Sequence, residues 1–440
     1  MRGSSADLRV GPGARRVTLP PGISGDVLRK PVVPPLADPD RAVRDALAAP
    51  AAGDTLVEAA RGARRACVVI CDVTRPVPNG LLLRPAIDAL LAGGVPLEGI
   101  TVVVATGLHR PNLGDELRRV VGDDWVLEHV RVENHDARDA GGLADLGATP
   151  DRGTPVTLHR GFVEADVRVV VGLVEPHFMA GYSGGRKLVA PGIAGEHTIR
   201  RLHAFRFMAD ERATTANLTA NPLHEEQLAI LGMVGPVFAV NTVIDEARDL
   251  VFVNAGEVVG SHDAAVAFAR TCSEVACAAP YDVIVTSAGG APLDATYYQT
   301  VKCMVTPLEA LAPGGDLVVL SSCAEGLGSA GFRDAQRRLV EAGQEAFAAE
   351  LAAKELASID EWQSQMLLRA TTRGRVHLWA AALPSADRPW TAVGWCPDAD
   401  ALLADVLRAR PGARVALIPE GPYVVPRVAP APVGPTASSG

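Results

Sequence analysis

Three Val-rich runs of this sequence break abruptly into glycine, proline and ionisable residues. With their following loops they read VVICDVTRPVPN (68–79), VVVATGLHRP (102–111) and VVVGLVEPHFMAGYSGGRK (169–187). Each has the composition of a buried strand followed by a loop. In open α/β sheets, ligands bind outside the carboxyl ends of the strands. The polar residues that follow the three runs are Asp72, Thr74, Arg75, His109, His177 and Lys187. These residue types are suited to holding an anion and moving protons.

Two histidines occupy corresponding places on separate loops. His109 follows the second run, and His177 follows the third. Histidine exchanges protons near neutral pH, so two histidines on different loops can flank one substrate as a paired acid and base. Taken singly, each is more often a structurally satisfied residue. Their matching positions favour the catalytic interpretation.

The glycine-rich stretch GYSGGRK (181–187) has the composition of a phosphate cradle, formed here by Ser183, Gly184 and Gly185. It is not a Walker loop, because Leu188 stands where serine or threonine would follow the lysine. No G-x-G-x-x-G follows a strand, so a dinucleotide site of the Rossmann type is unsupported. A plain glycine turn remains the alternative.

His203 lies one helical segment beyond Lys187 and can face the same pocket. A single histidine, with no cysteine or carboxylate at ligand spacing, makes a poor metal site by itself. If His203 binds a metal, the remaining ligands must come from elsewhere. The other histidines that we interpret as surface residues are His129, His135, His159, His224 and His262.

Arg75 follows Asp72 by three residues in the sequence D-V-T-R-P. The planar guanidinium of arginine matches a carboxylate or phosphate with two parallel hydrogen bonds. Arg75 is therefore a candidate anchor for an anionic substrate. An internal Asp72–Arg75 pair that stabilises the turn is the alternative.

The second half of the chain carries two further polar motifs. The stretch DATYYQTVK (294–302) places Tyr298, Gln299 and Lys302 on about one helical turn, and Trp362 begins another helical stretch in DEWQSQ. Both can be ordinary surface helices. Both can equally close over a substrate held by the first half.

Composition narrows the class of protein. The 440 residues, 48% hydrophobic and 21% charged, have a globular composition and are too many for one ordinary core. The net charge of −9, with no long basic run, argues against nucleic acid as a partner. We expect no membrane span and no secretory signal, because no long apolar stretch occurs. The seven scattered cysteines include no CxxC pair and indicate reduced thiols in the cytoplasm.

Strand and helix patterns alternate through the chain, which is typical of parallel, helix-covered sheets. We therefore predict an α/β fold of two α/β domains with mainly parallel sheets. The predicted parts are an N-terminal domain (1–265), a C-terminal domain (278–427) and a disordered tail (428–440), with a helix at 261–278 joining the halves. The main strands are expected at 67–71, 100–105, 129–134, 167–173, 282–286, 315–321, 375–381 and 413–418. The main helices are expected at 80–93, 112–121, 195–208, 296–311, 331–353, 359–370 and 397–409.

The motifs DxTRP, ATGLHRP, EPHFMAGYSGGRKLVAPGIAG, a downstream histidine, YYQTVK and EWQ follow one another in this order. In this arrangement the chain resembles the nickel-pincer lactate racemase family, from near residue 15 to near residue 425. The resemblance implies an active site in a cleft between the two domains. It also implies a nickel pincer nucleotide (pyridinium-3,5-bisthiocarboxylic acid mononucleotide) that is attached covalently to a lysine.

By position, the resemblance assigns a role to each candidate residue. Lys187 matches the attachment lysine, and His203 matches the histidine ligand of nickel. His109 and His177 match the paired acid and base. The residues expected to contact the cofactor besides Lys187 are Asp72, Thr74, Ser183, Gly184 and Gly185. The residues expected to contact the substrate are Arg75, Tyr298, Gln299, Lys302 and Trp362.

The activity implied is that of an isomerase, a racemase or epimerase acting at C2 of lactate or a related 2-hydroxy acid. The reaction would pass hydride to and from the cofactor by way of a 2-keto acid. The implied partners are the small substrate and, transiently, the cofactor-synthesis enzymes; an oligomer is possible. Two alternatives stay open. One is a 2-hydroxy acid oxidoreductase using a diffusible nicotinamide, and the other is a non-catalytic binding protein with a decayed site.

Overall fold

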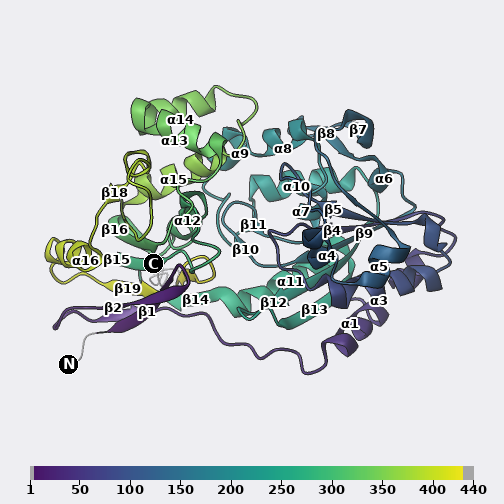
Figure 1. The fold of residues 1–440 in the computed structure, drawn as a ribbon, viewed down its shortest axis with the longest axis horizontal. Helices are drawn as coiled ribbons and strands as arrows, with labels where there is room; N and C mark the ends of the chain where they lie inside the picture. The colour runs from purple at the N-terminus through teal and green to yellow at the C-terminus, as the bar shows by residue number, and fades with distance from the viewer. Residues whose placement is uncertain (1–3, 430–440) are drawn as a thin grey trace, which may run out of the picture. The chain divides into compact units, whose positions relative to one another are not determined.

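The computed structural model describes residues 4–429, and the chain divides into two compact units. The N-terminal unit comprises residues 32–272 and 351–358. The C-terminal unit comprises the described part of residues 1–31, 273–350 and 359–440. Both are α/β units with mainly parallel sheets (Figure 1), so the predicted fold class is confirmed.

A six-stranded sheet in the order β13-β12-β9-β4-β5-β6 forms the centre of the N-terminal unit. Its strands are β4 (Ala66–Cys71), β5 (Ile100–Ala105), β6 (Arg131–Asn134), β9 (Val167–Leu173), β12 (Phe238–Ile244) and β13 (Leu250–Glu257). All neighbours pair in parallel except β12 and β13. The valine and isoleucine residues of the three central strands are buried, which explains their continuous apolar sequence.

Helices cover both faces of this sheet (Figure 1). Leu82 and Leu83 of α3 pack in the core with one set of alternate strand residues. On the other face, α7 packs closely against β9. A Cβ added at Gly172 of β9 would lie only 2.5 Å from the side chain of Leu188 in α7, so a larger residue would not fit there. The helices are α1 (Pro39–Ala48), α2 (Leu56–Ala59), α3 (Asn79–Ala92), α4 (Asp115–Val121), α5 (Asp124–His129), α6 (Arg160–Val163), α7 (Arg186–Val189), α8 (Glu196–Leu202), α9 (Phe205–Met208), α10 (Pro222–Gly232) and α11 (Val258–Ser273). Two hairpins pair β7 (Leu143–Ala148) with β8 (Pro155–His159) and β10 (Pro176–His177) with β11 (Gly181–Tyr182).

The C-terminal unit contains a second six-stranded sheet, fully parallel, in the order β18-β17-β16-β15-β19-β3. Its strands are β3 (Gly25–Val27), β15 (Tyr281–Ser287), β16 (Leu311–Ser321), β17 (Arg375–Ala380), β18 (Gly394–Trp395) and β19 (Val415–Ile418). Two further pairs are β1 (Ser5–Val10) with β2 (Gly13–Thr18), and β14 (Glu274–Cys277) with β20 (Val425–Val428). The helices are α12 (Tyr297–Val305), α13 (Ala330–Ala342), α14 (Gln344–Ala352), α15 (Glu361–Arg373) and α16 (Ala399–Arg408).

Residues 4–31 cluster with the C-terminal unit, whereas the sequence predicts one domain over 1–265. The reason is long-range pairing and packing. Strand β3 pairs with β19, and Leu8 and Val17 of the β1–β2 hairpin share a core with Val285 and Leu320. The predicted boundary at residue 265 falls inside α11, which ends at Ser273 and leads into β14. Most of the predicted tail, from residue 430 on, lies outside the described residues.

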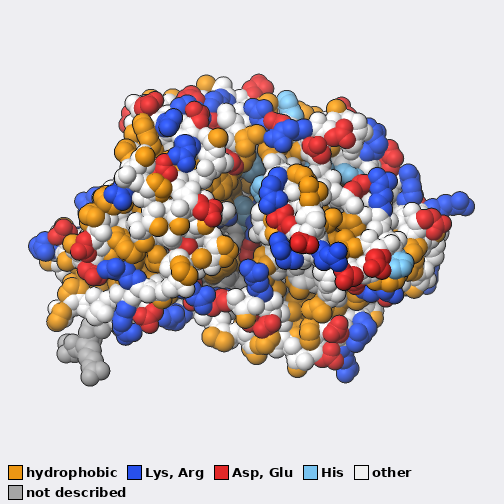
Figure 2. Space-filling model, viewed as in Figure 1, with side chains coloured by type: hydrophobic (Ala, Val, Ile, Leu, Met, Phe, Trp, Pro, Cys, Tyr) orange, Lys and Arg blue, Asp and Glu red, His pale blue; other side chains and the backbone are white. Residues whose placement is uncertain are grey.

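Acidic and basic side chains alternate over the face drawn in Figure 2, without a large area of one sign. Within residues 4–429, no helix has the length and apolar character that crossing a membrane requires.

Candidate active site

The polar residues of three sequence motifs lie at one edge of the N-terminal sheet. Strand β4 pairs in parallel with β5 on one side and with β9 on the other. The carboxyl ends of the three strands therefore meet at the same edge. Asp72 directly follows β4, His109 follows β5 after a short turn, and Glu175 and His177 follow β9. This is the edge at which open α/β sheets bind ligands.

Asp72 orients the ring of His109. Its Oδ2 lies 2.7 Å from Nδ1 of His109, and its Oδ1 accepts hydrogen bonds from the backbone N–H and hydroxyl of Thr74. Burial raises the pKa of Asp72, but the hydrogen bonds from His109 and Thr74 outweigh it and hold the pKa below its ordinary value. The ionised carboxylate only accepts hydrogen bonds, so Nδ1 of His109 carries the proton. The side chain of His109 is 62% exposed.

The side chain of Arg75 does not pair with Asp72. Its Nη1 instead forms an ion pair with Oε1 of Glu175, and both side chains are about three-quarters buried. The contact between these two residues is made by the backbone alone: the N–H of Arg75 donates to the carbonyl oxygen of Asp72. The sequence interpretation assigned no role to Glu175, although its place directly before Pro176 and His177 was a usable signal.

His177 lies in the short strand β10, opposite Gly181 of β11. Its Nδ1 accepts hydrogen bonds from the backbone N–H groups of Met179 and Ala180, each at 3.2 Å. These contacts favour the tautomer in which Nε2 carries the proton. Both candidate histidines are thus held at Nδ1, His109 by a carboxylate and His177 by backbone N–H groups.

The glycine-rich loop is tied to the end of β9 by Ser183. Its hydroxyl donates to the carbonyl of Leu173 at 2.7 Å and accepts from the backbone N–H of Glu175 at 3.1 Å. Gly184 and Gly185 have φ values of +77° and +49°, which L side chains rarely adopt. A Cβ on Gly185 would also lie 2.9 Å from the ring of His262. Backbone conformation and close packing therefore account for both glycines.

A buried contact between Arg186 and His262 packs against this loop. Arg186 is 2% exposed; its Nη2 donates to the carbonyl of Ala180, and its Nη1 lies 3.1 Å from Nε2 of His262. Burial, reinforced by the Arg186 charge, lowers the pKa of His262 to about 3. The interpretation of His262 as a surface residue was wrong, as was that of His135, because both side chains are buried. Helix α11 turns His262 inward, which the polar neighbours in sequence did not reveal.

Lys187 and His203 lie close enough to interact. The lysine charge contributes to lowering the pKa of His203, which burial lowers to about 4. Nδ1 of His203 donates to the carbonyl of Ile199 at 2.8 Å, so the neutral ring holds a lone pair on Nε2. A backbone partner of this kind fixes the tautomer of many metal-binding histidines.

These two side chains suit a metal whose other ligands are supplied by a cofactor and not by the protein. One neutral imidazole is a suitable ligand for nickel, and the amine of Lys187 lies in the same neighbourhood. Across residues 4–429, no group of three or more histidine, cysteine or acidic side chains is arranged to hold a metal ion. The sulfur of Cys71, which the Lys187 charge also reaches, stays protonated because burial raises its pKa to about 11.

Within the C-terminal unit, Tyr298 of α12 and Trp362 of α15 meet. The indole N–H of Trp362 lies 3.3 Å from the hydroxyl of Tyr298, and the amide of Gln363 donates to the Tyr298 carbonyl at 2.6 Å. Trp362 is 8% exposed, so α15 is not an ordinary surface helix. Gln299 and Lys302 lie on the same helix as Tyr298. Among the described residues, Oε1 of Gln299 and Oε1 of Gln363 are buried without a hydrogen-bond partner, a capacity that a ligand can use.

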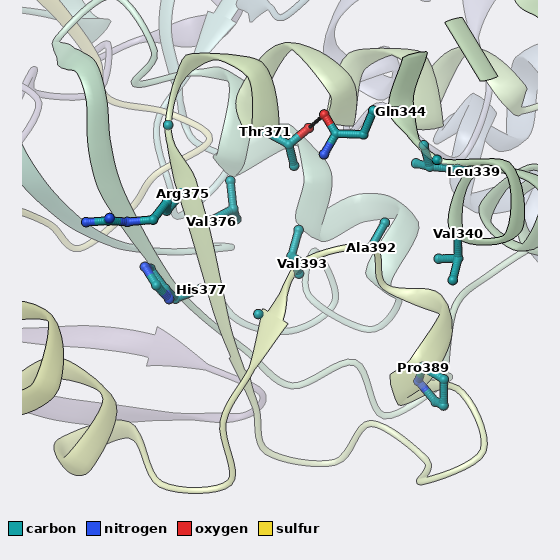
Figure 3. A pocket seen from close by; sticks show the side chains of 13 residues that line it. Leu339, Val340, Gln344, Thr371, Arg375, Val376, His377, Pro389, Ala392 and Val393 are labelled. Atoms are coloured by element: carbon teal, nitrogen blue, oxygen red, sulfur yellow. Dashed lines mark hydrogen bonds between the residues drawn. The ribbon is translucent and has the colours of Figure 1, made fainter. Parts of the chain in front are cut away.

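A surface cavity of about 630 Å³ in the C-terminal unit lies elsewhere, near the start of β17 (Figure 3). Arg375 and His377, which border it, both bond Asp316, and Thr371 bonds Gln344 across another part of its wall. No predicted site residue lines this cavity.

Family models match both halves of the chain. The model of the lactate racemase N-terminal domain matches residues 10–216, and that of the lactate racemase C-terminal domain matches residues 276–386. A lactate racemase of Thermoanaerobacterium thermosaccharolyticum is 31% identical over 344 residues, 76% of this chain and 78% of the relative. A lactate racemase of Lactiplantibacillus plantarum is 32% identical over 290 residues, 66% of this chain and 68% of the relative.

Solved structures agree with these sequence matches. The lactate racemase apoprotein from T. thermosaccharolyticum superposes with a TM-score of 0.88 at 26% identity, covering 96% of this chain and 100% of that one. A crystal structure of a Thermotoga maritima protein superposes with a TM-score of 0.62 at 16% identity, a likeness of fold alone, over 91% of this chain and 100% of that one.

Proposed function

The chain belongs to the lactate racemase family, and we propose that it interconverts the two configurations at C2 of lactate or a closely related 2-hydroxy acid. The observation that supports the proposal is the pair of histidines at one sheet edge, each held at Nδ1. We propose that each exchanges protons through Nε2. Racemisation needs proton exchange at the substrate oxygen for both configurations, and two histidines on different loops meet that need.

In the proposed reaction, one histidine takes the proton of the C2 hydroxyl while hydride leaves the α-carbon, which gives a planar 2-keto acid. Hydride then returns to the opposite face, and the other histidine gives a proton to the oxygen. Asp72 stabilises the charged ring of His109 whenever that ring holds two protons. The backbone N–H groups of Met179 and Ala180 fix the ring of His177.

Lys187 and His203 are the residues that we propose to hold a nickel pincer nucleotide, with Lys187 as its covalent attachment and His203 Nε2 as a ligand of nickel. When bound, this group supplies the hydride acceptor and donor that the α-carbon requires. Asp72, Thr74 and the loop residues Ser183 to Gly185 would border it.

Arg75 is proposed to bind the substrate carboxylate with two hydrogen bonds. Tyr298, Gln299, Lys302 and Trp362 of the C-terminal unit are proposed to contact the substrate as well. The buried, unpaired amide oxygen of Gln299 supports that role. We also propose a cytoplasmic location, supported by seven free thiols, and transient contact with cofactor-synthesis enzymes.

The proposal is tested by producing the protein beside cofactor-synthesis enzymes and incubating it with single-enantiomer 2-hydroxy acids. Chiral chromatography should show both enantiomers approaching equal amounts, without added nicotinamide. Net formation of reduced nicotinamide would favour the oxidoreductase alternative, and no change in any substrate would favour the binding protein. Intact-mass spectrometry should show an adduct in the wild type that Lys187→Ala removes, and His203→Ala should lose nickel while keeping its fold.

A further inference from the structure

Two arginine–glutamate pairs connect the ends of the adjacent strands β4 and β9. At the amino ends, Arg65 precedes β4 and Glu164 precedes β9; their side chains lie 3.6 Å apart and are about half exposed. At the carboxyl ends, Arg75 and Glu175 form the more buried pair. The first pair lies away from every predicted site residue, whereas the second includes the proposed substrate anchor.

The backbone of Glu175 is held from both sides by one residue of the glycine-rich loop. The hydroxyl of Ser183 accepts the N–H of Glu175 at 3.1 Å, and the N–H of Ser183 donates to the Glu175 carbonyl at 3.0 Å. Ser183 also bonds Leu173 at the end of β9. Glu175 therefore keeps a fixed position relative to the loop that leads to Lys187.

The side chain of Glu175 uses one nitrogen of Arg75. The ion pair is made through Nη1, and within residues 4–429 no other side-chain partner of the Arg75 guanidinium is found. The Nε–Nη2 edge of a guanidinium can bind a carboxylate with two parallel hydrogen bonds. A glutamate bound to Nη1 restricts rotation of the long arginine side chain. Less conformational entropy is then lost when the arginine binds the substrate.

We propose that Glu175 is a positioning residue, which holds Arg75 so that its Nε–Nη2 edge meets the substrate carboxylate at a fixed distance from Lys187. This inference rests on the proposed function of Arg75. It assigns Glu175 no contact with the reacting atoms. Its effect is on substrate binding and alignment, exerted through Arg75.

The test compares Glu175→Ala and Glu175→Gln with Glu164→Gln in the cofactor-loaded enzyme. Glu175→Ala should raise KM for every 2-hydroxy acid about 10-fold, the scale of one lost hydrogen bond to a charged group, and change kcat less than about 3-fold. Glu175→Gln should raise KM less, because its amide oxygen still accepts from Arg75. Glu164→Gln breaks the matched pair at the other end of the same strands and should leave both constants unchanged.

A double variant separates positioning from general support of the fold. If Glu175 acts through Arg75, the effects of Glu175→Ala and Arg75→Lys on KM should be far from additive. Additive effects, or an unchanged KM in Glu175→Ala, overturn the proposal. A lower KM overturns it too, because that result means that Glu175 competes with substrate for Arg75.

A binding experiment distinguishes failure of the positioning role from failure of the proposed function. The cofactor-free protein is titrated calorimetrically with sodium lactate and, as an uncharged control, with lactamide. Weaker lactate binding in Glu175→Ala and an unchanged Glu164→Gln support the positioning role. If the wild type neither racemises nor binds lactate, the proposed function fails together with the inference built on it. If the wild type does both and Glu175→Ala matches it, only the positioning role fails.

Discussion

Each unit of this molecule contains a buried aspartate bonded to a histidine, and the two pairs differ in their surroundings. Asp72 accepts from Nδ1 of His109, and Asp316 accepts from Nε2 of His377, both at 2.7 Å. Asp316 also accepts from Arg375 through two nitrogens and from Arg410. The side chain of His109 is 62% exposed, against 23% for His377.

The difference shows when an Asp–His pair is suited to proton transfer. Burial raises the pKa of Asp316, but hydrogen bonds from Arg375, His377 and Arg410 outweigh it and lower the pKa to about 2. His377 is therefore one of several groups that hold this carboxylate in place. Among the described residues, Asp72 has one ionisable hydrogen-bond partner, His109, whose side chain is mostly exposed. The same contact is therefore structural in the C-terminal unit and, on our proposal, supports catalysis in the N-terminal unit.

The largest expected effect follows from removing the proposed acid–base rings. His109→Ala and His177→Ala should each lower turnover by about 10²-fold or more, the usual scale for a general acid or base. The double variant should lose little more than either single variant, because racemisation needs both. His377→Ala in the same chiral assay should stay within about twofold of the wild type. A wild-type rate for His109→Ala or His177→Ala would contradict the catalytic assignment.

A smaller loss is expected when Asp72 keeps its shape but loses its charge. Asp72→Asn replaces the charged acceptor of His109 Nδ1 with a neutral amide oxygen. Because a hydrogen bond to a charged group contributes about 1.5–3 kcal/mol, kcat should fall roughly 10- to 100-fold. Circular dichroism and cofactor loading should match the wild type. A loss of cofactor without a loss of kcat per loaded molecule would place Asp72 at the cofactor and not behind His109.

The sequence predicted the strand ends well because that signal is local. Valine-rich runs that stop at glycine and proline mark where β4, β5 and β9 end, so Asp72 and His109 could be placed at one edge. The partners of those residues could not be predicted, since Arg75 can reach either Asp72 or Glu175 and only packing decides between them. The burial of His262 likewise depends on which face of α11 meets the glycine-rich loop.

Long-range pairing also lay beyond the sequence patterns. Strand β3 has three residues, too few for a period of two to be recognised, and its partner β19 follows almost 400 residues later. The predicted helix over 195–208 is interrupted at His203, whose backbone closes α8 while its ring bonds Ile199. Its spacing from Lys187 predicted that His203 can face the same pocket, and only the resemblance to a family assigned it the role of a nickel ligand.

The two units also differ in their proposed contacts to the substrate, where we expect changes of about tenfold in substrate binding. Arg75→Lys keeps the charge but loses the planar fork, so it should weaken every 2-hydroxy acid by a similar factor of about 10. Trp362→Ala should change the ranking of substrates, because it alters the shape around Tyr298 and leaves the shared carboxylate contact intact. Steady-state kinetics over small and bulky 2-hydroxy acids measure both. The roles would be reversed if Arg75→Lys reordered the panel and Trp362→Ala scaled it evenly.

The smallest effect on activity is expected at Asp316, where the effect on stability should be large. Asp316→Asn leaves Arg375, Arg410 and His377 without their shared carboxylate, and the free energy of unfolding at neutral pH should fall by roughly 3 kcal/mol, with kcat within twofold of the wild type. Because the folded-state pKa of Asp316 lies below its ordinary value of 3.8, its contribution is complete above about pH 4 and disappears as the pH falls toward about 2. Denaturant unfolding at a series of pH values should therefore show the wild type and the variant converging over that interval. A gap that stays constant down to pH 2 would mean that the charge of Asp316 is not what stabilises the unit, and the distinction drawn between the two aspartate–histidine pairs would lose its physical basis.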